Sequence, residues 1–424
     1  MSINKEKITV AIIGCGRFAQ YFVELFKAHP YVKKVYVCDL IRARAEKYSQ
    51  HFDVEIIDSF EEALASKEVN AIAIFTQRFK HGPMAIEALK AGKHVYSSVP
   101  CSLKVEEIAE IKRLVEETHL TYSMGETGFY RAASCFCRRE YAKGSFGRFA
   151  YGESQYNHDI RNMEGSFRSS GGEDWKKFAG IPPFFYPTHT TSMLLSSMPG
   201  VYAKKVTAMG FANSERTDIY GTDGQNLYNN PFSNESMLIE LSNGGIIRVN
   251  ENRCVAWHGP ETFISQFYGS EGCYDFSFAR ATFTHWQGGE ENPNAVIAHD
   301  VTKEIQPEEL YNAINENYEE AVAKIAQCWG FYNTSPIQPT ERLPKEFEGL
   351  RNGHNGTHHF LIDDFCRAYW TGKLSPTNIW EVARWNIPGL IAHESALAGG
   401  QPMEVVDLGD SPADWEVLPW DKAE

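Results

Sequence analysis

The stretch over residues 8–39 constrains the fold of this chain more than any other. It opens with a continuous apolar, β-branched run at 8–13, which stops at Gly14. Such a run is typical of a strand buried on both faces of a parallel sheet. A glycine turn, a helical stretch to about His29 and a second apolar run at 35–38 follow in order. The stretch therefore predicts a strand, turn, helix and strand in sequence.

The turn Gly14-Cys15-Gly16 has the residues that a dinucleotide-binding unit requires. Gly14 permits a tight turn, and Gly16 lets the backbone approach a pyrophosphate without a Cβ atom in the way. The amides at the start of the next helix face the phosphates, because the helix dipole favours negative charge there. Asp39 lies about twenty residues beyond the turn, where a carboxylate binds the adenosine ribose and repels a 2′-phosphate. The unit predicts NAD rather than NADP; the alternative is a glycine-rich turn without a ligand.

The alternation of strands and helices continues to about residue 125. Apolar strand runs alternate with helical stretches at 61–66, 71–76, 81–91, 94–98, 105–119 and 121–124. Such alternation is typical of a parallel sheet with right-handed crossovers. We therefore expect a Rossmann dinucleotide-binding domain over residues 1–125, in a protein of the α/β class.

Beyond about residue 148 the pattern changes to alternating strands and hairpins. Turn residues at 243–245 and 269–271 each separate two strand-like runs. We expect residues 126–424 to form an α+β domain with a mostly antiparallel open sheet, whose open face receives the substrate. The late helices of this domain are expected to pack back on the first domain.

The segment 287–352 is polar, rich in Glu, Asn and Pro, and only weakly periodic. Long stretches of this kind are uncommon inside compact domains. We expect an ordered surface insertion or an oligomer contact, and assign it no functional residue.

Composition excludes several classes of function. A chain of 424 residues is too long for one ordinary core, and its net charge of −14 disfavours nonspecific binding to nucleic acid or to an anionic membrane. The nine cysteines include no paired CxxC spacing, which favours reduced thiols, no zinc module and a cytoplasmic location. No apolar run is long enough for a membrane span, and the first strand begins too early for a cleaved signal.

Several segments together resemble the Gfo/Idh/MocA oxidoreductases, which are NAD(P)-dependent enzymes of sugars and cyclitols. The matching features are the glycine turn with Asp39, the turn from Thr76-Gln77 to His81, the run Gly92-Lys93-His94-Val95 and the hairpin-rich second domain. The resemblance implies homo-oligomers that pair through the open sheet. The candidate cofactor contacts are Gly14, Gly16, Arg17, Phe18, Asp39, Thr76, His81, Ser98, Pro100 and Glu126.

One departure from that family concerns catalysis. Simple dehydrogenases of the family carry a Glu-Lys-Pro whose lysine is the acid/base, and this chain reads Ser98-Val99-Pro100 there. A valine cannot transfer a proton. The tetrapeptide Tyr186-Pro187-Thr188-His189 resembles a motif of the NAD-dependent glycosidases of the same superfamily. Those enzymes also carry Val-Pro, but after a glutamate where this chain has Ser98, so the likeness is partial.

Oxidation of a secondary alcohol requires hydride transfer to nicotinamide and a base within hydrogen-bond reach of the hydroxyl. An imidazole is suited to this role because its ordinary pKa lies near working pH. We predict His189 as that base and Tyr186 as the second acid/base or positioning group. The alternative is that His189 only caps a helix.

Other candidates come from loops at the expected sheet edges. Glu126 is expected to contact the nicotinamide ribose and Tyr130 the substrate, because both follow the sixth strand of the parallel sheet. The remaining predicted substrate contacts, each with a surface or turn residue as the alternative, are His158, Asp159, Trp175 and His358. Asp159 is expected to orient His158. No ligand spacing supports a metal site, so no metal is predicted.

Three functions are compatible with these residues. The leading one is an NAD-dependent oxidoreductase acting on a ring hydroxyl of a sugar, glycoside or cyclitol. The second is a redox-neutral glycosidase, which oxidises, eliminates, adds water and re-reduces. The third is a non-catalytic NAD- or sugar-binding protein that has lost its lysine. The sequence names neither the sugar nor the carbon that is oxidised.

Overall fold

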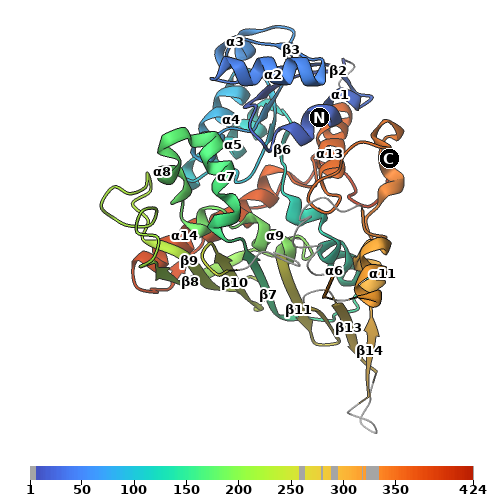
Figure 1. Cartoon of the computed structure of the whole chain (residues 1–424). Coiled ribbons are helices and arrows are strands. Elements are labelled where there is room, and N and C mark those ends of the chain that lie inside the picture. The colour runs from blue at the N-terminus through green and yellow to red at the C-terminus, as the bar shows by residue number, and fades with distance from the viewer. Residues whose placement is uncertain are drawn as a thin grey trace.

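The computed structural model describes residues 6–256, 263–277, 280–287, 295–317, 319–320 and 334–423. Within these residues the chain folds around a six-stranded and a nine-stranded sheet, which Figure 1 shows one above the other with helices between them. One continuous hydrophobic core includes Ile12 of the first sheet and Ile239 of the second. The expected division at residue 125 therefore stays a prediction.

The first sheet is parallel throughout, with the order β3-β2-β1-β4-β5-β6. Its strands are β1 Ile8–Ile13, β2 Val32–Cys38, β3 Glu55–Ile56, β4 Ala71–Ile74, β5 His94–Ser97 and β6 Tyr122–Met124. All residues of β1 are buried, as in strands covered by helices on both faces. Strands β2 and β3 lie on one side of β1 and strands β4 to β6 on the other, so the order in which strands are added reverses between β1 and β4. Ligands of doubly wound folds bind at the carboxyl ends of the strands at such a point. The Rossmann fold expected from the sequence is confirmed.

The helices of this part follow the strands as the sequence pattern indicates. They are α1 Gln20–Ala28, α2 Arg42–Phe52, α3 Phe60–Ala65, α4 His81–Lys90 and α5 Val105–Thr118. Helix α3 begins where the Ser59 hydroxyl accepts a hydrogen bond from the Glu62 amide at 3.0 Å. Helix α5 buries Ile108, Ile111 and Leu114, which recur at helical spacing.

The second sheet has the order β14-β13-β12-β11-β7-β10-β9-β8-β15. Its strands are β7 Phe149–Asn157, β8 Ala203–Ala212, β9 Phe232–Leu241, β10 Ile246–Asn252, β11 Phe263–Gly269, β12 Gly272–Ser277, β13 Arg280–Trp286, β14 Val296–Asp300 and β15 Met403–Glu404. Neighbouring strands are antiparallel except β7 and β10, which run parallel. The mostly antiparallel sheet expected from the hairpin pattern is therefore confirmed.

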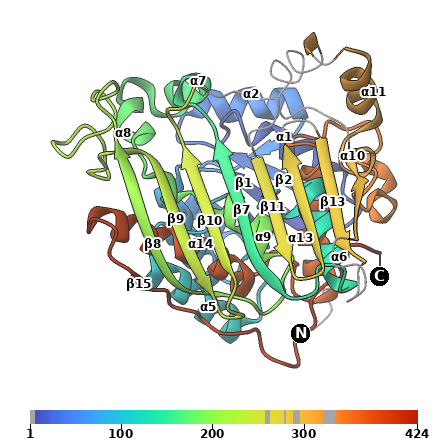
Figure 2. The same cartoon turned by 90° about the horizontal axis from the view of Figure 1, so that it is seen from below.

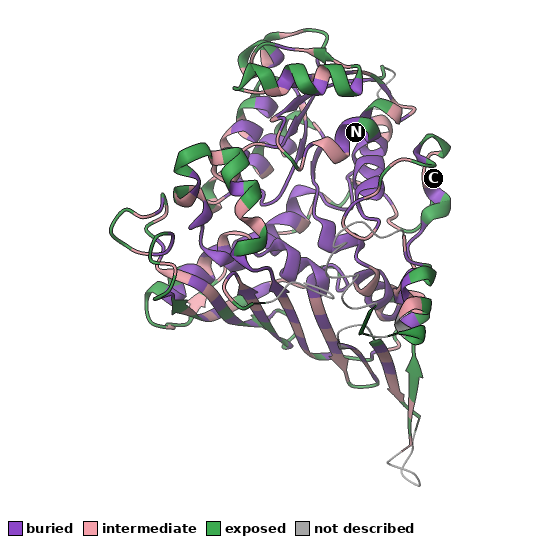
Figure 3. Cartoon of the chain, viewed as in Figure 1, coloured by how far each residue is buried: buried purple, intermediate pink, exposed green. Residues whose placement is uncertain are grey.

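One broad face of this second sheet points away from the first sheet. Figure 2 shows that face without a helix in front of it, and Figure 3 shows buried and less buried residues alternating along its strands. Strand β9 illustrates the alternation, since Ile239 is buried and its neighbour Leu238 is 46% exposed. The candidate catalytic residues lie on the opposite, helix-covered face. The expectation that the open face receives the substrate stays a prediction, which the position of these candidates does not favour.

Helices of the second half cover the inner face of that sheet and join it to the first. They are α6 Ala132–Ala142, α7 Ile160–Gly171, α8 Trp175–Ala179, α9 Thr188–Leu195, α10 Thr302–Ile305, α11 Glu308–Glu316, α13 His358–Thr371 and α14 Ile379–Leu397. Helix α9 packs on β7 and β11, α13 packs on α1, and α14 contacts both α5 and β8. None of the described helices is long and apolar enough to cross a lipid bilayer.

The segment 287–352 is not simply a surface insertion. Part of it lies outside the described residues, but Gln338 and Arg342 are buried. The Gln338 amide donates hydrogen bonds to the carbonyls of Tyr130 and Asn355, at 2.7 and 3.0 Å. The Arg342 guanidinium reaches two carboxylates of α13. Polar composition concealed this packing because the buried groups are polar and paired with one another.

Candidate active site

The first part of the site is the glycine turn after β1. Gly14 has a φ of +102°, and a Cβ atom there would lie 2.5 Å from the carbonyl oxygen of Phe75. Only glycine fits this position without strain. A Cβ atom on Gly16 would meet no protein atom within 4 Å. The protein therefore leaves no room for a side chain at Gly14, whereas the space beside Gly16 is open.

The residues around the turn fit a dinucleotide. Helix α1 begins after Ala19, which gives its first amides no side-chain cap; those of Tyr21 and Phe22 donate to the carbonyls of Phe18 and Ala19, and the dipole of this helix end favours a phosphate. The Asp39 carboxylate is held by the amides of Cys15 and Ile41, both at 2.8 Å. Its partly exposed position at the end of β2 matches the predicted ribose contact. Arg17 is exposed, and Phe18 packs on Phe22 of α1 with ring centroids 5.0 Å apart.

Substitutions at the two glycines separate the folding role of the turn from its binding role. We expect Gly14→Ala to destabilise the protein by about 1–3 kcal/mol through backbone strain. Gly16→Ala is expected to leave the melting temperature unchanged and to weaken NAD binding at least about tenfold, because its new methyl group enters the open space. Thermal melts and NAD titrations of both variants measure this. Unchanged NAD affinity in Gly16→Ala would mean that the pyrophosphate passes elsewhere.

His81 links the loops that follow β4 and β5. Its Nδ1 lies 2.8 Å from the Pro100 carbonyl oxygen, and its Nε2 lies 3.1 Å from the Thr76 carbonyl oxygen and 3.3 Å from the Ser98 hydroxyl. Burial lowers the pKa of His81 to about 4. The imidazole is only 1% exposed, so it holds the two loops in place from the protein interior. Cofactor contact by Thr76, Ser98 and Pro100 stays a prediction.

The centre of the site is a chain of three side chains from three elements. Glu126 follows β6, Tyr186 ends the short 3-10 helix Pro183–Phe185, and His189 lies in the first turn of α9. His189 Nδ1 is 2.6 Å from Glu126 Oε1, and His189 Nε2 is 3.1 Å from the Tyr186 hydroxyl. The Glu126 carboxylate also accepts the Gly128 amide at 2.6 Å. The sequence predicted all three residues for the site but did not predict that Glu126 binds His189.

The hydrogen bonds of this chain fix which nitrogen of His189 is basic. A carboxylate accepts only, so Nδ1 donates to Glu126 and Nε2 keeps its lone pair toward Tyr186. No side chain caps α9, and both ring nitrogens of His189 have other partners, so the interpretation of His189 as a helix cap is wrong. Burial raises the pKa of Tyr186 to about 12, against the effect of the nearby Arg78 guanidinium.

Glu126 retains a free acceptor. Within the described part of the chain, its Oε2 atom is buried and accepts no hydrogen bond. A buried carboxylate oxygen without a partner is costly, and a ligand hydroxyl would satisfy it. Contact with the nicotinamide ribose therefore stays a prediction for this atom.

Aromatic rings form the walls around His189. Tyr156 and Phe263 stack with their centroids 4.5 Å apart, and both rings lie within 5.3 Å of the His189 ring. The Arg253 guanidinium lies 4.7 Å from the Tyr156 ring and pairs with the buried Glu251 at 2.7 Å. Tyr156 and Phe263 are each only 4% exposed, so their rings enclose His189 on these sides.

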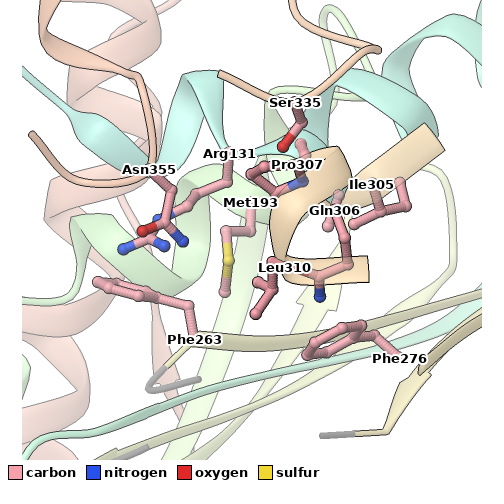
Figure 4. A pocket seen from close by; sticks show the side chains of 12 residues that line it. Arg131, Met193, Phe263, Phe276, Ile305, Gln306, Pro307, Leu310, Ser335 and Asn355 are labelled. Atoms are coloured by element: carbon pink, nitrogen blue, oxygen red, sulfur yellow. The ribbon is translucent and has the colours of Figure 1, made fainter. Parts of the chain in front are cut away.

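A small cavity adjoins these walls, as Figure 4 shows. It lies between α9, the inner face of the sheet and the segment that begins α11. Its lining residues are Arg131, Ala132, Ala133, Met193, Phe263, Phe276, Ile305, Gln306, Pro307, Leu310, Ser335 and Asn355. Five of these come from the segment 287–352, which therefore contributes to the surroundings of the site.

Two predicted substrate contacts are buried away from the site. Trp175 is 3% exposed in a separate apolar cluster with Phe167 and Tyr220, so its ring is not available to a sugar. Tyr130 is fully buried, its hydroxyl donates to Asp364, and Arg342 donates to that hydroxyl at 2.8 Å. Both rings lie in a core, where a large ring gains more free energy than on a surface, and substrate contact by either residue stays a prediction that this packing does not favour.

The side chains of Asp159 and His158 form hydrogen bonds with different partners. The Asp159 carboxylate caps α7 and binds the Arg161 guanidinium and the amides of Val255 and Ala256. Arg161 and these amides lower the pKa of Asp159 to about 2. His158 instead bonds the Tyr156 hydroxyl through Nδ1. The prediction that Asp159 orients His158 is therefore wrong, and substrate contact by His158 stays a prediction.

His358 is also buried, packed on Phe22 and bonded through Nε2 to His354 Nδ1 at 2.8 Å. Substrate contact by His358 stays a prediction, which this packing does not favour. His354, four residues earlier, is partly exposed and lies 5.5 Å from the Phe18 ring, and it is close enough to His189 for their charges to interact. Among the described residues, no three His, Cys, Asp or Glu side chains form a group that could hold a metal ion.

Sequence reasoning missed Arg78, and from the run that begins at His354 it chose His358 as the candidate. Arg78 begins a short 3-10 helix after β4, and its guanidinium lies 4.7 Å from the centre of the Tyr186 ring. Its place at the carboxyl end of a parallel strand was a signal that could have identified it. His354 had no comparable signal, because only folding brings the 354–359 segment to the glycine turn.

Comparison with known proteins places this geometry in a family. A family model of the Gfo/Idh/MocA oxidoreductases, described as oxidoreductase family with an NAD-binding Rossmann fold, matches residues 8–126. A glycosyl hydrolase family 109 protein of Saccharopolyspora erythraea is 30% identical over 428 residues, which cover 95% of this chain and 83% of that protein. The chain belongs to glycosyl hydrolase family 109, within the Gfo/Idh/MocA superfamily. The resemblance inferred from the sequence is confirmed.

Solved structures with this fold are more distant in sequence. Levoglucosan dehydrogenase in complex with NADH and levoglucosan has a TM-score of 0.67 at 16% identity, covering 94% of this chain and 100% of its own. An oxidoreductase from Agrobacterium radiobacter in complex with NAD+, L-tartaric acid and magnesium has a TM-score of 0.66 at 13% identity, covering 94% and 98%. These likenesses show the fold alone. This family member is an enzyme of the oxidoreductase type with NAD as its cofactor.

Proposed function

We propose that this enzyme cleaves a glycoside by a redox-neutral reaction that starts at a ring hydroxyl of the sugar. One observation carries the proposal: the buried hydrogen-bonded chain Glu126–His189–Tyr186 stands at the edge of the Rossmann sheet of a chain whose expected lysine position is Val99. Two proton-transfer groups are present where simple oxidation requires one. The family name of its relatives supports glycoside cleavage in addition to redox chemistry.

His189 is the base of the oxidation step. Its Nε2 accepts the proton of the sugar hydroxyl, while bound NAD supplies the hydride acceptor and later returns the hydride. Glu126 holds the ring through Nδ1 at 2.6 Å and stabilises the imidazolium that forms. Burial of both groups excludes water and strengthens their interaction.

Tyr186 is the group that serves elimination. The ketone acidifies the neighbouring C–H bond, a base takes that proton, and the C–H electron pair forms the double bond as the glycosidic C–O bond breaks and the leaving oxygen takes a proton from water. Tyr186 lies beside His189 and is the candidate for this base; the Arg78 cation near its ring lowers the pKa of Tyr186 only in part against the effect of burial. Water then adds across the double bond, and the ketone returns to the alcohol. No net oxidation remains, so NAD is regenerated in each turnover.

A second candidate is a sugar or cyclitol dehydrogenase that releases NADH. It is favoured by Ser98, which stands where the NAD-dependent glycosidases have a glutamate. Without that carboxylate the reaction could stop at the ketone. The experiment is to incubate the NAD-loaded enzyme with a panel of glycosides in deuterated water, recording NADH absorbance and deuterium in the released sugar.

The two candidates give opposite results in this experiment. Redox-neutral cleavage predicts released sugar with deuterium next to the oxidised carbon and no accumulated NADH. A dehydrogenase predicts NADH in proportion to ketone and an intact glycosidic bond. Bound NAD with neither product would support the third function, a non-catalytic binding protein.

We also propose that copies of the chain pair through the outward face of the nine-stranded sheet. Several large apolar side chains are exposed on its strands, including Met209 at 72%, Phe211 at 57% and Ile246 at 46%. Exposed apolar side chains that gather on one face mark contact sites on many proteins. Light scattering of Met209→Glu against the parent chain tests the proposal, since a charge on this face should weaken the pairing.

A further inference from the structure

The Arg78 side chain lies at the edge of the Glu126–His189–Tyr186 chain without a counter-charge. Its guanidinium carbon is 4.7 Å from the centre of the Tyr186 ring and 5.5 Å from the centre of the Phe167 ring. The residue is partly exposed. Across the part of the chain that the structure describes, the Arg78 guanidinium makes no hydrogen bond to protein and no ion pair, and only the backbone carbonyl accepts a hydrogen bond, from the His81 amide.

Three arginines with little or no exposure pair with carboxylates, whereas the buried Arg138 donates, within the described part of the chain, only to the Phe129 and Ser196 carbonyls and the Ser196 hydroxyl. Arg342 pairs with Asp363 and Asp364, and Arg253 pairs with Glu251 at 2.7 Å. Arg384 pairs with Asp407 at 3.1 Å. Among the described residues the Arg78 guanidinium has neither a carboxylate nor a carbonyl partner, so its donors beside the candidate catalytic residues are available to a ligand anion.

Two aromatic rings are a suitable support for an anion-binding guanidinium. Cation–π contact fixes the plane of the group but uses none of its N–H donors. The fork of donors then remains available for two parallel hydrogen bonds to a carboxylate, sulfate or phosphate. Because the chain carries a net charge of −14, an anion would be attracted by Arg78 locally and not by the protein surface as a whole.

The position of Arg78 favours an anion on the sugar over the cofactor phosphates. Its supporting rings, Tyr186 and Phe167, come from the half of the chain that also carries His189. The phosphates are expected at the glycine turn and the start of α1. A pyranose ring is large enough to place one hydroxyl at His189 and a substituent at Arg78.

We propose that Arg78 binds an anionic substituent of the sugar, so that the substrates of this enzyme are acidic glycosides. The shared chemistry is a carboxylate of a uronic acid or a sulfate ester, and this inference deepens the proposed function and rests on it. Arg78 forms the bidentate contact through its guanidinium N–H groups. Tyr186 holds the guanidinium in place through its ring face.

The test compares matched sugars that differ only in charge. Methyl galactosiduronic acid is compared with methyl galactoside, and galactose 6-sulfate with galactose, on the full NAD-loaded chain. We expect the acidic member of a pair to bind at least about tenfold more tightly, the value of a charged hydrogen-bond pair. The uronate and sulfate arms show which anion is preferred.

Variants assign the effect to Arg78. Arg78→Met is expected to remove the preference, with about a 10- to 100-fold loss for the acidic sugar and little change for the neutral one. Arg78→Lys should retain part of the preference for the acidic sugar, because the charge stays but the two parallel N–H donors of the guanidinium are lost. Lys80→Met is the matched control, since Lys80 is an exposed cation two residues away, and it should change nothing. Equal binding of acidic and neutral sugars to the parent chain would overturn the proposal.

Two further measurements separate the possible failures. If Arg78→Met weakens NAD binding and not the sugar preference, the anion belongs to the cofactor and the proposal is overturned. Calorimetric binding to His189→Ala, which cannot carry out the proposed chemistry, keeps the inference independent of turnover. An Arg78-dependent preference for acidic sugars in that variant supports the anion site even if no glycoside is cleaved. Cleavage of neutral glycosides only would support the proposed function and overturn the anion site.

Discussion

Replacing His189 with alanine is expected to lower kcat by about 10²–10⁴-fold, the usual contribution of a positioned general base. The imidazole Nε2 is the only predicted proton acceptor for the sugar hydroxyl, and the alanine variant leaves Glu126 without the group it orients. NAD affinity should change by less than about threefold, because the glycine turn is untouched. Steady-state rates and an NAD titration on the same preparation measure both quantities.

Matched variants make this result interpretable. His51→Ala removes an exposed imidazole of α2 and should leave kcat unchanged. Glu126→Gln keeps a hydrogen-bonding side chain next to Nδ1 but removes the charge that stabilises the imidazolium, so it should lower kcat. Full activity of His189→Ala would show that another residue takes the proton and would remove the basis of the mechanism.

Replacing Arg342 with methionine is expected to destabilise the protein by about 3–5 kcal/mol, the usual cost of leaving a buried charge unpaired. Arg342 binds both Asp363 and Asp364 of α13, the second at 2.9 Å, and none of these side chains is more than 3% exposed. It also donates to the Tyr130 hydroxyl at 2.8 Å. Urea unfolding of the parent chain and Arg342→Met measures the difference.

The size of this effect should depend on pH. Burial raises the pKa of Asp364 to about 6, which is above its value in the unfolded chain. Loss of Arg342 would raise this pKa further, because the guanidinium stabilises the carboxylate. A carboxyl whose folded pKa is raised makes folding less favourable as pH rises through that value. The variant should therefore be closer to the parent in stability near pH 5 than near pH 8.

The control for Arg342→Met is the same substitution at a surface pair. Arg280 and Asp300 are 3.4 Å apart and about half exposed, so Arg280→Met should cost no more than about 1 kcal/mol. Equal destabilisation by the two variants would mean that the buried network contributes no more than a surface ion pair. The network also connects the segment 287–352 to α13, so Arg342→Met tests whether that segment is part of the core.

The sequence alone determined the first sheet and its ligand. A strand covered on both faces must be apolar throughout, so the run at 8–13 identified β1 without ambiguity. The glycines and Asp39 follow from local backbone geometry and short-range spacing, which are properties a sequence displays directly. The same holds for the hairpins of the second sheet and for the lysine position occupied by Val99.

Only the tertiary structure decided how the catalytic groups meet. Glu126 and His189 are 63 residues apart, and no spacing predicts that their side chains lie 2.6 Å from each other. The tertiary structure likewise decided that Trp175 and Tyr130 lie in a hydrophobic core. The free energy gained by burying a ring depends on neighbours that come from distant segments. Local patterns specify elements, whereas contacts between elements depend on packing of the whole chain.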